Sequence, residues 1–392
     1  MAEQNPSPIV MLDLARQFLP LREEILDAIG RVCDSQRFVL GPEVEQFEEA
    51  AAASLHVPHA AGCASGTDAL WLAMAALKIQ AGDAVVTTPF SFFATVSSIL
   101  RCRARPVLAD IDPRTFNLSA KAASIAVDRA SSPVRALLPV HLYGQCVDWD
   151  ALDILAREKG LLLIEDAAQA FGAQWRSRPA GSLSEAAAFS FYPTKNLSAF
   201  GDAGLVSSRS AATDERVRML RAHGMRRRYV HDEVGWNSRL DTLQAAVLTV
   251  KLRHLPRWNE DRRRVAARYD DLLRATGLVV DFDQAKTLEG LVLPFVDPRA
   301  FHVYHQYVIR APRRNQLREY MAERHIGTEV YYPLPLHLQS SLSGLGYRSG
   351  DFPVSERAAD EVLALPIYPE LREDEQERVV GAIADFYAGR AV

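Results

Sequence analysis

A single lysine in the stretch 190–204 has the surroundings expected of a reactive amine. Lys195 follows a short apolar segment and stands between Pro193 and a glycine-rich turn that contains Gly201 and Gly204. A lysine amine forms a Schiff base with a carbonyl compound when burial and neighbouring groups favour its neutral form. The segment therefore indicates either a carbonyl-binding lysine or an ordinary surface lysine in a loop.

Two acids directly follow the apolar segment 161–164, where a carboxylate would be costly without a partner. For Asp166 that partner could be a protonated pyridine nitrogen, because a carboxylate beside this nitrogen keeps the ring an electron sink. Gln169 follows three residues later and could reach a phenolate oxygen on the same ring. The alternative is that Asp166 only caps the helix that follows the strand.

A phosphate-binding turn and an aromatic ring precede these residues. Gly66 and Thr67 begin an Ala/Leu-rich helix, whose free backbone N–H groups and positive dipole end favour anions. The alternative is that Ser65 or Thr67 only caps this helix. Phe92 lies in an aromatic run just after the apolar segment 84–88, so it could stack on a heteroaromatic ring or belong to the core.

The elements that must position these side chains alternate along residues 60–210. Short apolar runs alternate there with helical segments, which is typical of a largely parallel sheet covered by helices. The predicted strands are residues 84–88, 106–109, 136–140, 161–164 and 187–191. Such sheets bind ligands beyond the carboxyl ends of their strands, where Asp166 and Lys195 would meet. A phosphate turn, an aromatic ring, an acid and a lysine are the set that a pyridoxal phosphate enzyme requires.

A break in the helical pattern indicates a domain boundary. Apolar residues recur at helical spacing over 242–255, Pro256 ends or kinks this helix, and a charged helix follows over 260–274. We therefore expect a large domain over residues 1–256, including an N-terminal segment, and a small C-terminal domain over 257–392. A strand predicted at 306–310 and a helix at 314–325 indicate an α+β small domain.

Composition excludes several classes of protein. The 392 residues are 48% hydrophobic and 24% charged, as in globular proteins, and 45 Lys+Arg against 49 Asp+Glu give a net charge of −4. This balance lacks the basic field that nucleic-acid binding needs. The four cysteines lack CxxC spacing, which argues against a zinc site or disulfides and fits a reducing cytoplasm. No apolar run or signal sequence indicates a membrane, so we expect a soluble cytoplasmic protein without a bound metal.

These residues and their neighbours resemble the DegT/StrS family of pyridoxal phosphate-dependent aminotransferases, which act in sugar-nucleotide biosynthesis. The resemblance extends over nearly the whole chain and includes the motifs at residues 40–48, 65–67, 165–169, 190–195 and 201–204. It implies the α/β fold of the fold-type I pyridoxal phosphate transferases. In that fold a large domain surrounds a mostly parallel sheet, and a smaller α+β domain follows.

The resemblance also implies roles for single residues. Lys195 is implied to form the Schiff base and to shuttle protons, and Asp166 to pair with the pyridinium nitrogen. Gln169 is implied to contact the phenolate oxygen, and Phe92 to cover the ring. The residues implied to bind the cofactor phosphate, through hydroxyl and backbone donors, are Gly66, Thr67 and Ser190.

Two further segments are implied to bind substrate. The loop with Asn237 and Arg239 is implied to cross to the neighbouring subunit, where Asn237 reaches the phosphate and Arg239 meets the substrate; a homodimer with shared active sites follows. The family commonly has His-Tyr-Pro where this chain has Tyr331, Tyr332 and Pro333. Tyr332 therefore matches the substrate-contacting pattern, whereas Tyr331 departs from it at the adjoining contact.

The activity implied is transamination of a nucleotide-diphosphate keto-sugar by an amino acid donor, which is glutamate by family analogy. The segment 229–246 is most similar to members that aminate C3 of the sugar, and amination at C4 is the alternative. A sugar dehydratase of the same fold has His where Lys195 stands, so this lysine argues against dehydration. A non-catalytic regulator with the same fold is a further alternative, against which the complete cofactor set argues.

Overall fold

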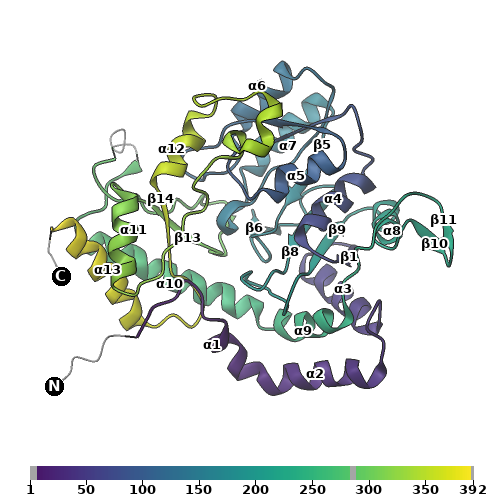
Figure 1. Cartoon of the computed structure of the whole chain (residues 1–392), viewed down its shortest axis with the longest axis horizontal. Helices are drawn as coiled ribbons and strands as arrows, with labels where there is room; N and C mark the ends of the chain where they lie inside the picture. The colour runs from purple at the N-terminus through teal and green to yellow at the C-terminus, as the bar shows by residue number, and fades with distance from the viewer. Residues whose placement is uncertain (1–6, 283–287, 390–392) are drawn as a thin grey trace.

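A seven-stranded sheet forms the centre of the larger part of the molecule, with strand order β1-β9-β8-β5-β4-β2-β3. The computed structural model describes residues 7–282 and 288–389. Neighbouring strands from β8 to β3 run parallel, whereas β9 is antiparallel to both β1 and β8. Figure 1 shows this sheet, made of β1 (His59–Cys63), β2 (Ala84–Thr87), β3 (Arg105–Leu108), β4 (Val134–Leu137), β5 (Leu162–Asp166), β8 (Ala186–Ser190) and β9 (Gly204–Ser208).

The five predicted strands of this region are confirmed as β2, β3, β4, β5 and β8, with ends that differ by up to three residues. Strands β1 and β9 were not predicted, because His-Ala-Ala-Gly-Cys and Gly-Leu-Val-Ser-Ser contain few of the bulky apolar residues that mark a strand. The prediction of a largely parallel sheet is also confirmed. The antiparallel β9 is the feature that the pattern did not indicate.

Helices cover both faces of the sheet, because alternate residues of each strand point to opposite sides. Ile164 and Ala188 pack with α4, α5 and α8, whereas Leu163 and Phe189 pack in a second core with α2, α3, α7 and α9. Burial on both faces explains why the central strands are continuous apolar runs. The helices are α2 (Arg22–Ser35), α3 (Pro42–Ser54), α4 (Gly66–Ala76), α5 (Ala94–Arg101), α6 (Ala120–Arg129), α7 (Trp149–Lys159), α8 (Ala211–Leu220) and α9 (Thr242–Leu252).

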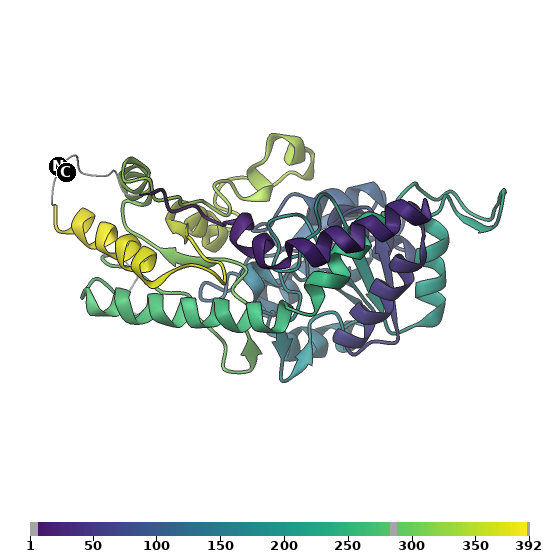
Figure 2. The same ribbon diagram turned by 90° about the horizontal axis from the view of Figure 1, so that it is seen from below.

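A smaller α+β unit is joined to this layered part by α10 (Leu255–Ala275), a helix of 21 residues that runs along one side of the molecule in Figure 2. Its first turn packs in the core of the large part, and its later turns pack in a separate core with the small unit. The small unit consists of β13 (Tyr307–Arg310) paired antiparallel with β14 (Val362–Leu365), and of α11 (Arg314–Glu323), α12 (Pro353–Glu361) and α13 (Glu373–Tyr387).

The helical break predicted at Pro256 corresponds to the end of α9 and the start of α10, which carries this proline in its first turn. We propose residue 257 as the domain boundary on this basis. The core of the small unit also contains Ile9 and Tyr143, so the two parts share an extensive contact. Within residues 7–282 and 288–389, no helix is long and apolar enough to cross a membrane.

Shorter elements lie between these. They include α1 (Leu14–Phe18), the small sheet of β6 (Gln174–Trp175), β7 (Arg178–Pro179) and β12 (Ala300–Phe301), and the hairpin of β10 (Met225–Arg227) and β11 (Val230–His231). Short 3-10 helices occur at Leu19–Leu21, Leu142–Gly144, Leu336–Leu338 and Ser340–Leu345. Figures 1 and 2 both show the β10–β11 hairpin projecting from the end of the molecule opposite the small unit. Its Tyr229 is 77% exposed, so the hairpin has little packing against its own chain.

Candidate active site

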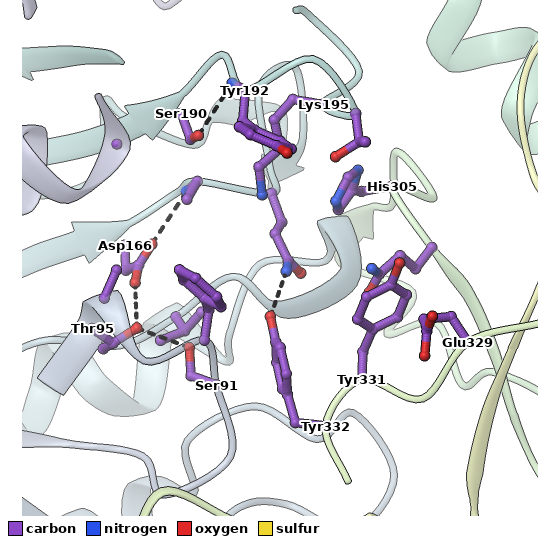
Figure 3. Close-up of a pocket in the computed structure, with 18 of the residues that line it drawn as sticks. Ser91, Thr95, Asp166, Ser190, Tyr192, Lys195, His305, Glu329, Tyr331 and Tyr332 are labelled. Carbon is purple, nitrogen blue, oxygen red and sulfur yellow. Dashed lines mark hydrogen bonds between the residues drawn. The ribbon is translucent and has the colours of Figure 1, made fainter. Parts of the chain in front are cut away.

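A cavity of about 900 Å³ opens beyond the carboxyl ends of β5 and β8, where the small unit faces the sheet. Figure 3 shows Asp166 and Ser190 on one side of this cavity, Tyr331 and Glu329 on the other, and Lys195 between them. The structure brings together most of the residues predicted from sequence, namely Gly66, Thr67, Phe92, Asp166, Gln169, Ser190, Lys195, Tyr331 and Tyr332. Asn237 and Arg239 do not line it.

Lys195 lies in the loop that follows β8 and is only partly exposed, through the cavity. Its backbone N–H donates to the carbonyl of Tyr192 at 2.8 Å, which closes a tight turn. Burial lowers the pKa of its amine from 10.5 to about 8, and the negative charge of Asp166 opposes part of that shift. The amine is therefore far more available in its neutral, nucleophilic form than that of a surface lysine.

A second lysine, Lys251, binds the loop that carries Lys195. The ammonium of Lys251, on α9, donates to the carbonyl oxygen of Ser198 at 2.9 Å and to its hydroxyl at 2.7 Å. Lys251 is only 3% exposed, and burial lowers its pKa to about 8 as well. The loop that carries Lys195 is thus tied to a helix of the large part.

Asp166 ends β5 with its carboxylate buried beneath the cavity. Its Oδ2 accepts a hydrogen bond from the Thr95 hydroxyl at 2.7 Å, and Ser91 lies 2.8 Å behind that hydroxyl. Burial raises the pKa of Asp166, whereas the hydrogen bond from Thr95 and the charge of Lys195 oppose the rise. A protonated ring nitrogen beside this carboxylate would stabilise its ionised form, which is the chemistry expected of a pyridinium partner.

The adjoining acid has a different role. Glu165 is fully buried on the other side of the strand, where its carboxylate accepts from backbone N–H groups at 181, 183 and 184 and from the Ser184 hydroxyl. His141 lies 2.9 Å from it. Glu165 is therefore satisfied within the fold, and Asp166 is the acid of this pair that faces the cavity.

The side-chain amide of Gln169 has a fixed orientation. Its Oε1 accepts from the backbone N–H of Tyr143 at 2.6 Å, and its Nε2 donates to the Tyr332 hydroxyl at 3.2 Å. An amide nitrogen carries two hydrogens, so the second remains available for an acceptor in the cavity. A phenolate oxygen on a ring that pairs with Asp166 fits this requirement.

The start of α4 forms a cradle against the end of β8. Ser65 caps the helix by accepting from the backbone N–H of Asp68 at 3.1 Å, so the predicted capping role and the anion-binding geometry occur together. A Cβ atom at Gly66 would lie 2.5 Å from the Cβ of Ser190, too close for any residue but glycine. The backbone N–H groups of α4 and the Ser190 hydroxyl thus meet at one point, which suits a phosphate.

Phe92 is 60% exposed and lines the cavity, so it is not a core residue. Its ring centroid lies 6.4 Å from that of Tyr332, whereas the neighbouring Phe90 is fully buried. Phe92 therefore offers an aromatic face to a ring held between Asp166 and Lys195. The carboxylate of Asp166, the amide of Gln169, the glycine cradle of α4 and the ring of Phe92 together match the groups of pyridoxal phosphate.

Several residues of the cavity were not predicted. Thr95 follows the aromatic run that contains Phe92, and a hydroxyl in the segment that follows a predicted strand was the available signal for it. His305 comes from the segment before β13; its Nδ1 lies 3.2 Å from Oδ1 of Asn196, the residue after Lys195. Burial and the nearby charge of Lys195 lower the pKa of His305 well below 6.5, so its ring is neutral. No local motif distinguishes it.

Asn237 and Arg239 lie in the segment after β11, outside the cavity of their own chain. The backbone of Asn237 pairs with Ala222, and the Ser238 hydroxyl between the two residues donates to Asp68 at 2.8 Å. A contribution of Asn237 and Arg239 to catalysis would therefore have to be made to the cavity of a second chain.

The sequence matches the DegT/DnrJ/EryC1/StrS aminotransferase family over residues 20–384. The chain belongs to this family. A "Pleiotropic regulatory protein" of Geobacillus stearothermophilus is 45% identical over 97% of this chain and 98% of its own. A dTDP-3-amino-3,4,6-trideoxy-alpha-D-glucose transaminase of Streptomyces venezuelae is 41% identical, covering 98% of each chain. A UDP-N-acetyl-3-dehydro-alpha-D-glucosamine 3-aminotransferase of Acidithiobacillus ferrooxidans is 39% identical over 96% of this chain and 97% of its own.

Solved structures of family members have the same fold. S. venezuelae DesV, in complex with a ketimine intermediate, superimposes with a TM-score of 0.91 at 40% identity over 99% of this chain and 100% of its own. Bacillus subtilis NtdA, with bound cofactor PMP, gives 0.88 at 28% identity over 100% of this chain and 87% of its own. The fold is therefore that of the fold-type I pyridoxal phosphate transferases. The family member described here is a pyridoxal phosphate-dependent aminotransferase.

Proposed function

We propose that this aminotransferase moves an amino group from glutamate to the C3 keto group of a sugar carried on a nucleotide diphosphate. The observation that carries the proposal is the meeting, in one cavity, of the Lys195 amine with its lowered pKa, the buried carboxylate of Asp166 and the glycine cradle of α4. Amination at position 3 is supported by the names of the dTDP-sugar and UDP-sugar relatives, both of which specify that carbon.

Each cavity residue has a distinct part in this proposal. Pyridoxal phosphate supplies an electron sink for the carbon that loses its proton. Lys195, whose lowered pKa suits a base near neutral pH, would hold the cofactor and would carry the proton that leaves the donor's α-carbon. Asp166 would pair with the protonated ring nitrogen, and Gln169 would donate a hydrogen bond to the ring oxygen. The residues proposed to bind the phosphate, cover the ring and contact the sugar are Gly66, Thr67, Ser190, Phe92, Tyr331 and Tyr332.

We further propose a homodimer in which Asn237 and Arg239 complete the partner's cavity. Their position outside their own cavity and the weakly packed β10–β11 hairpin beside them support this arrangement. Asn237→Ala and Lys195→Ala chains, each inactive alone, should regain about a quarter of wild-type activity after mixing and subunit exchange. Half of the dimers would then be mixed, and each mixed dimer would have one intact site. An absence of any regain would contradict shared sites.

The regulatory name of the Geobacillus relative favours one other candidate, a non-catalytic regulator of the same fold. Such a protein could retain the fold without a reactive amine. The burial that lowers the pKa of Lys195 has no evident use in it, because burying a lysine amine costs stability and brings no gain unless the amine reacts. The dehydratase alternative would require a histidine at position 195.

The test is the reverse reaction. Purified protein is incubated with 2-oxoglutarate and with matched 3-amino and 4-amino sugar nucleotides, on dTDP and on UDP, and the products are read by mass spectrometry. Formation of glutamate and a 3-keto-sugar nucleotide, lost in Lys195→Ala, is expected. Turnover of the 4-amino isomers alone would contradict amination at C3. Turnover of no sugar, by a protein that binds pyridoxal phosphate, would favour the regulator.

A further inference from the structure

Tyr143 uses all three of its hydrogen-bonding groups to join separate walls of the active-site cavity, although it does not line the cavity itself. Its backbone N–H donates to Oε1 of Gln169 at 2.6 Å, and its backbone carbonyl accepts from the N–H of Gln306 at 3.3 Å. Its phenol donates to the backbone carbonyl of Tyr331. One residue thus connects the cofactor-facing amide, the strand side of the small unit and the loop with the two tyrosines.

The backbone of Tyr143 has an unusual conformation, which indicates that these hydrogen bonds are a determined feature of the fold. Its φ is +59°, in the left-handed region that a bulky side chain rarely adopts, and Gly144 follows at +101°. Such a backbone persists only where surrounding contacts determine it, and it is more common at functional sites. The ring is 4% exposed and packs edge-on to Phe116 at 6.0 Å. Burial raises the pKa of the phenol well above 10, so the hydroxyl remains a donor at all working pH values.

The loop held by this phenol is the one that faces the substrate side of the cavity. Tyr332 follows Tyr331 directly, and its hydroxyl is the acceptor for the Nε2 of Gln169. The position of Gln169 is in turn set by the backbone of Tyr143. Tyr143 therefore positions both the Gln169 amide on the cofactor side and the Tyr331–Tyr332 loop on the substrate side. Tyr143 and Tyr331 are 188 positions apart in the sequence.

We propose that Tyr143 is a positioning residue whose phenol holds the Tyr331–Tyr332 loop at the distance from Gln169 that the sugar substrate requires. This inference rests on the proposed function for its kinetic part. The cofactor-facing contact is made by the backbone of Tyr143 and the substrate-loop contact by its side chain. Removing the hydroxyl alone should therefore affect the sugar half-reaction and spare the amino acid half-reaction.

The variant Tyr143→Phe deletes one oxygen and keeps the ring and the backbone. Tyr269→Phe is the matched control, because Tyr269 is fully buried in the same core and its hydroxyl has no hydrogen-bond partner among the described residues. For Tyr143→Phe we expect unchanged cofactor absorbance, an unchanged rate of the glutamate half-reaction and a KM for the amino-sugar nucleotide raised about tenfold, equivalent to about 1.4 kcal/mol. Tyr269→Phe should match the wild type in all three.

A second measurement does not depend on activity. In cofactor-free protein, hydrogen–deuterium exchange of peptides over residues 327–338 should be faster in Tyr143→Phe than in the wild type and Tyr269→Phe, while β13 and β14 exchange as before. If the wild type turns over no sugar nucleotide, the proposed substrate is wrong, and this exchange pattern still decides the role of Tyr143. Wild-type exchange and KM in Tyr143→Phe would overturn the inference. Equal loss in both half-reactions, or faster exchange throughout the core, would also overturn it.

Discussion

Lys195 should titrate about 2.5 pH units below an ordinary lysine in the cofactor-free protein, because burial lowers its pKa from 10.5 to about 8. At pH 7 roughly 10% of the amine would then be neutral, against roughly 0.03% for a pKa of 10.5, a ratio of about 300. Acylation requires the neutral amine, so its rate reports this fraction directly. The rate at Lys195 should rise about tenfold per pH unit below about pH 7, more slowly through pH 8, and level off above about pH 9.

The assay is brief labelling with acetic anhydride from pH 6 to pH 10, followed by mass spectrometry of the peptide that carries Lys195. The exposed Lys121 in the same digest normalises the amount of reagent. Lys251 provides a second control: its pKa is also lowered to about 8, but at 3% exposure it should remain unlabelled. A rate at Lys195 that still rises tenfold per unit between pH 9 and pH 10 would refute the effect of burial on this amine.

The charge of Asp166 should shift the pKa of Lys195 in a predictable direction. Its negative charge raises the pKa of Lys195, against the larger effect of burial. In Asp166→Asn the midpoint of labelling should therefore move to lower pH, and a midpoint that moves to higher pH would contradict the coupling of the two groups through charge. Saturation with pyridoxal phosphate should protect Lys195 from the reagent in the wild type.

Three further changes test other parts of the site. Thr95→Val removes the hydroxyl that donates to Asp166, so cofactor affinity, measured by absorbance titration, should fall about tenfold, the effect of losing a hydrogen bond to a charged group. Gly66→Ala places a Cβ 2.5 Å from that of Ser190 and should open the phosphate cradle, raising the dissociation constant of pyridoxal phosphate at least as much. Lys251→Met changes how stability depends on pH. With a folded pKa of about 8 and an unfolded pKa of 10.5, Lys251 makes the wild type gain about 1.6 kcal/mol between pH 8 and pH 9.5, and urea denaturation should show that gain missing in the variant.

Two of these changes have a matched control variant, and the third is tested by the sign of its effect. Thr95→Ser keeps the donor hydroxyl and should retain cofactor affinity, whereas a loss equal to that of Thr95→Val would mean that the methyl group, not the hydrogen bond, matters. Gly344→Ala adds the same methyl where no atom lies within 4 Å and should leave cofactor binding unchanged. For Lys251 the sign is decisive: between pH 8 and 10.5 the unfolded chain binds the extra proton, so stability must rise with pH. A wild type that loses stability relative to Lys251→Met over this interval would refute the lowered pKa.

Local pattern was enough to locate the residues at strand ends and at the start of a helix. Asp166 ends β5 and Gly66 begins α4, where an apolar run and a small turn with a capping serine indicated a strand end and a helix start. Ser190, which ends β8, was implied by the family resemblance. These features depend on interactions between near neighbours in the chain, such as side-chain alternation in a strand and the unpaired N–H groups of a helix turn. The combination of these residues with Phe92 and Lys195 indicated the cofactor, and the family resemblance added the reaction class.

Tertiary structure decided which side chains meet. The hydrogen bond from Thr95 to Asp166 joins residues 71 positions apart, and the phenol of Tyr143 reaches the carbonyl of Tyr331 across 188. These contacts exist because β5 lies between β4 and β8 in the sheet and because the small unit closes over the strand ends, an order set by packing of the whole chain. The same holds for the depressed pKa of Lys195. Its residue type and position are evident in the sequence, but the burial that makes it reactive comes from segments distant along the chain.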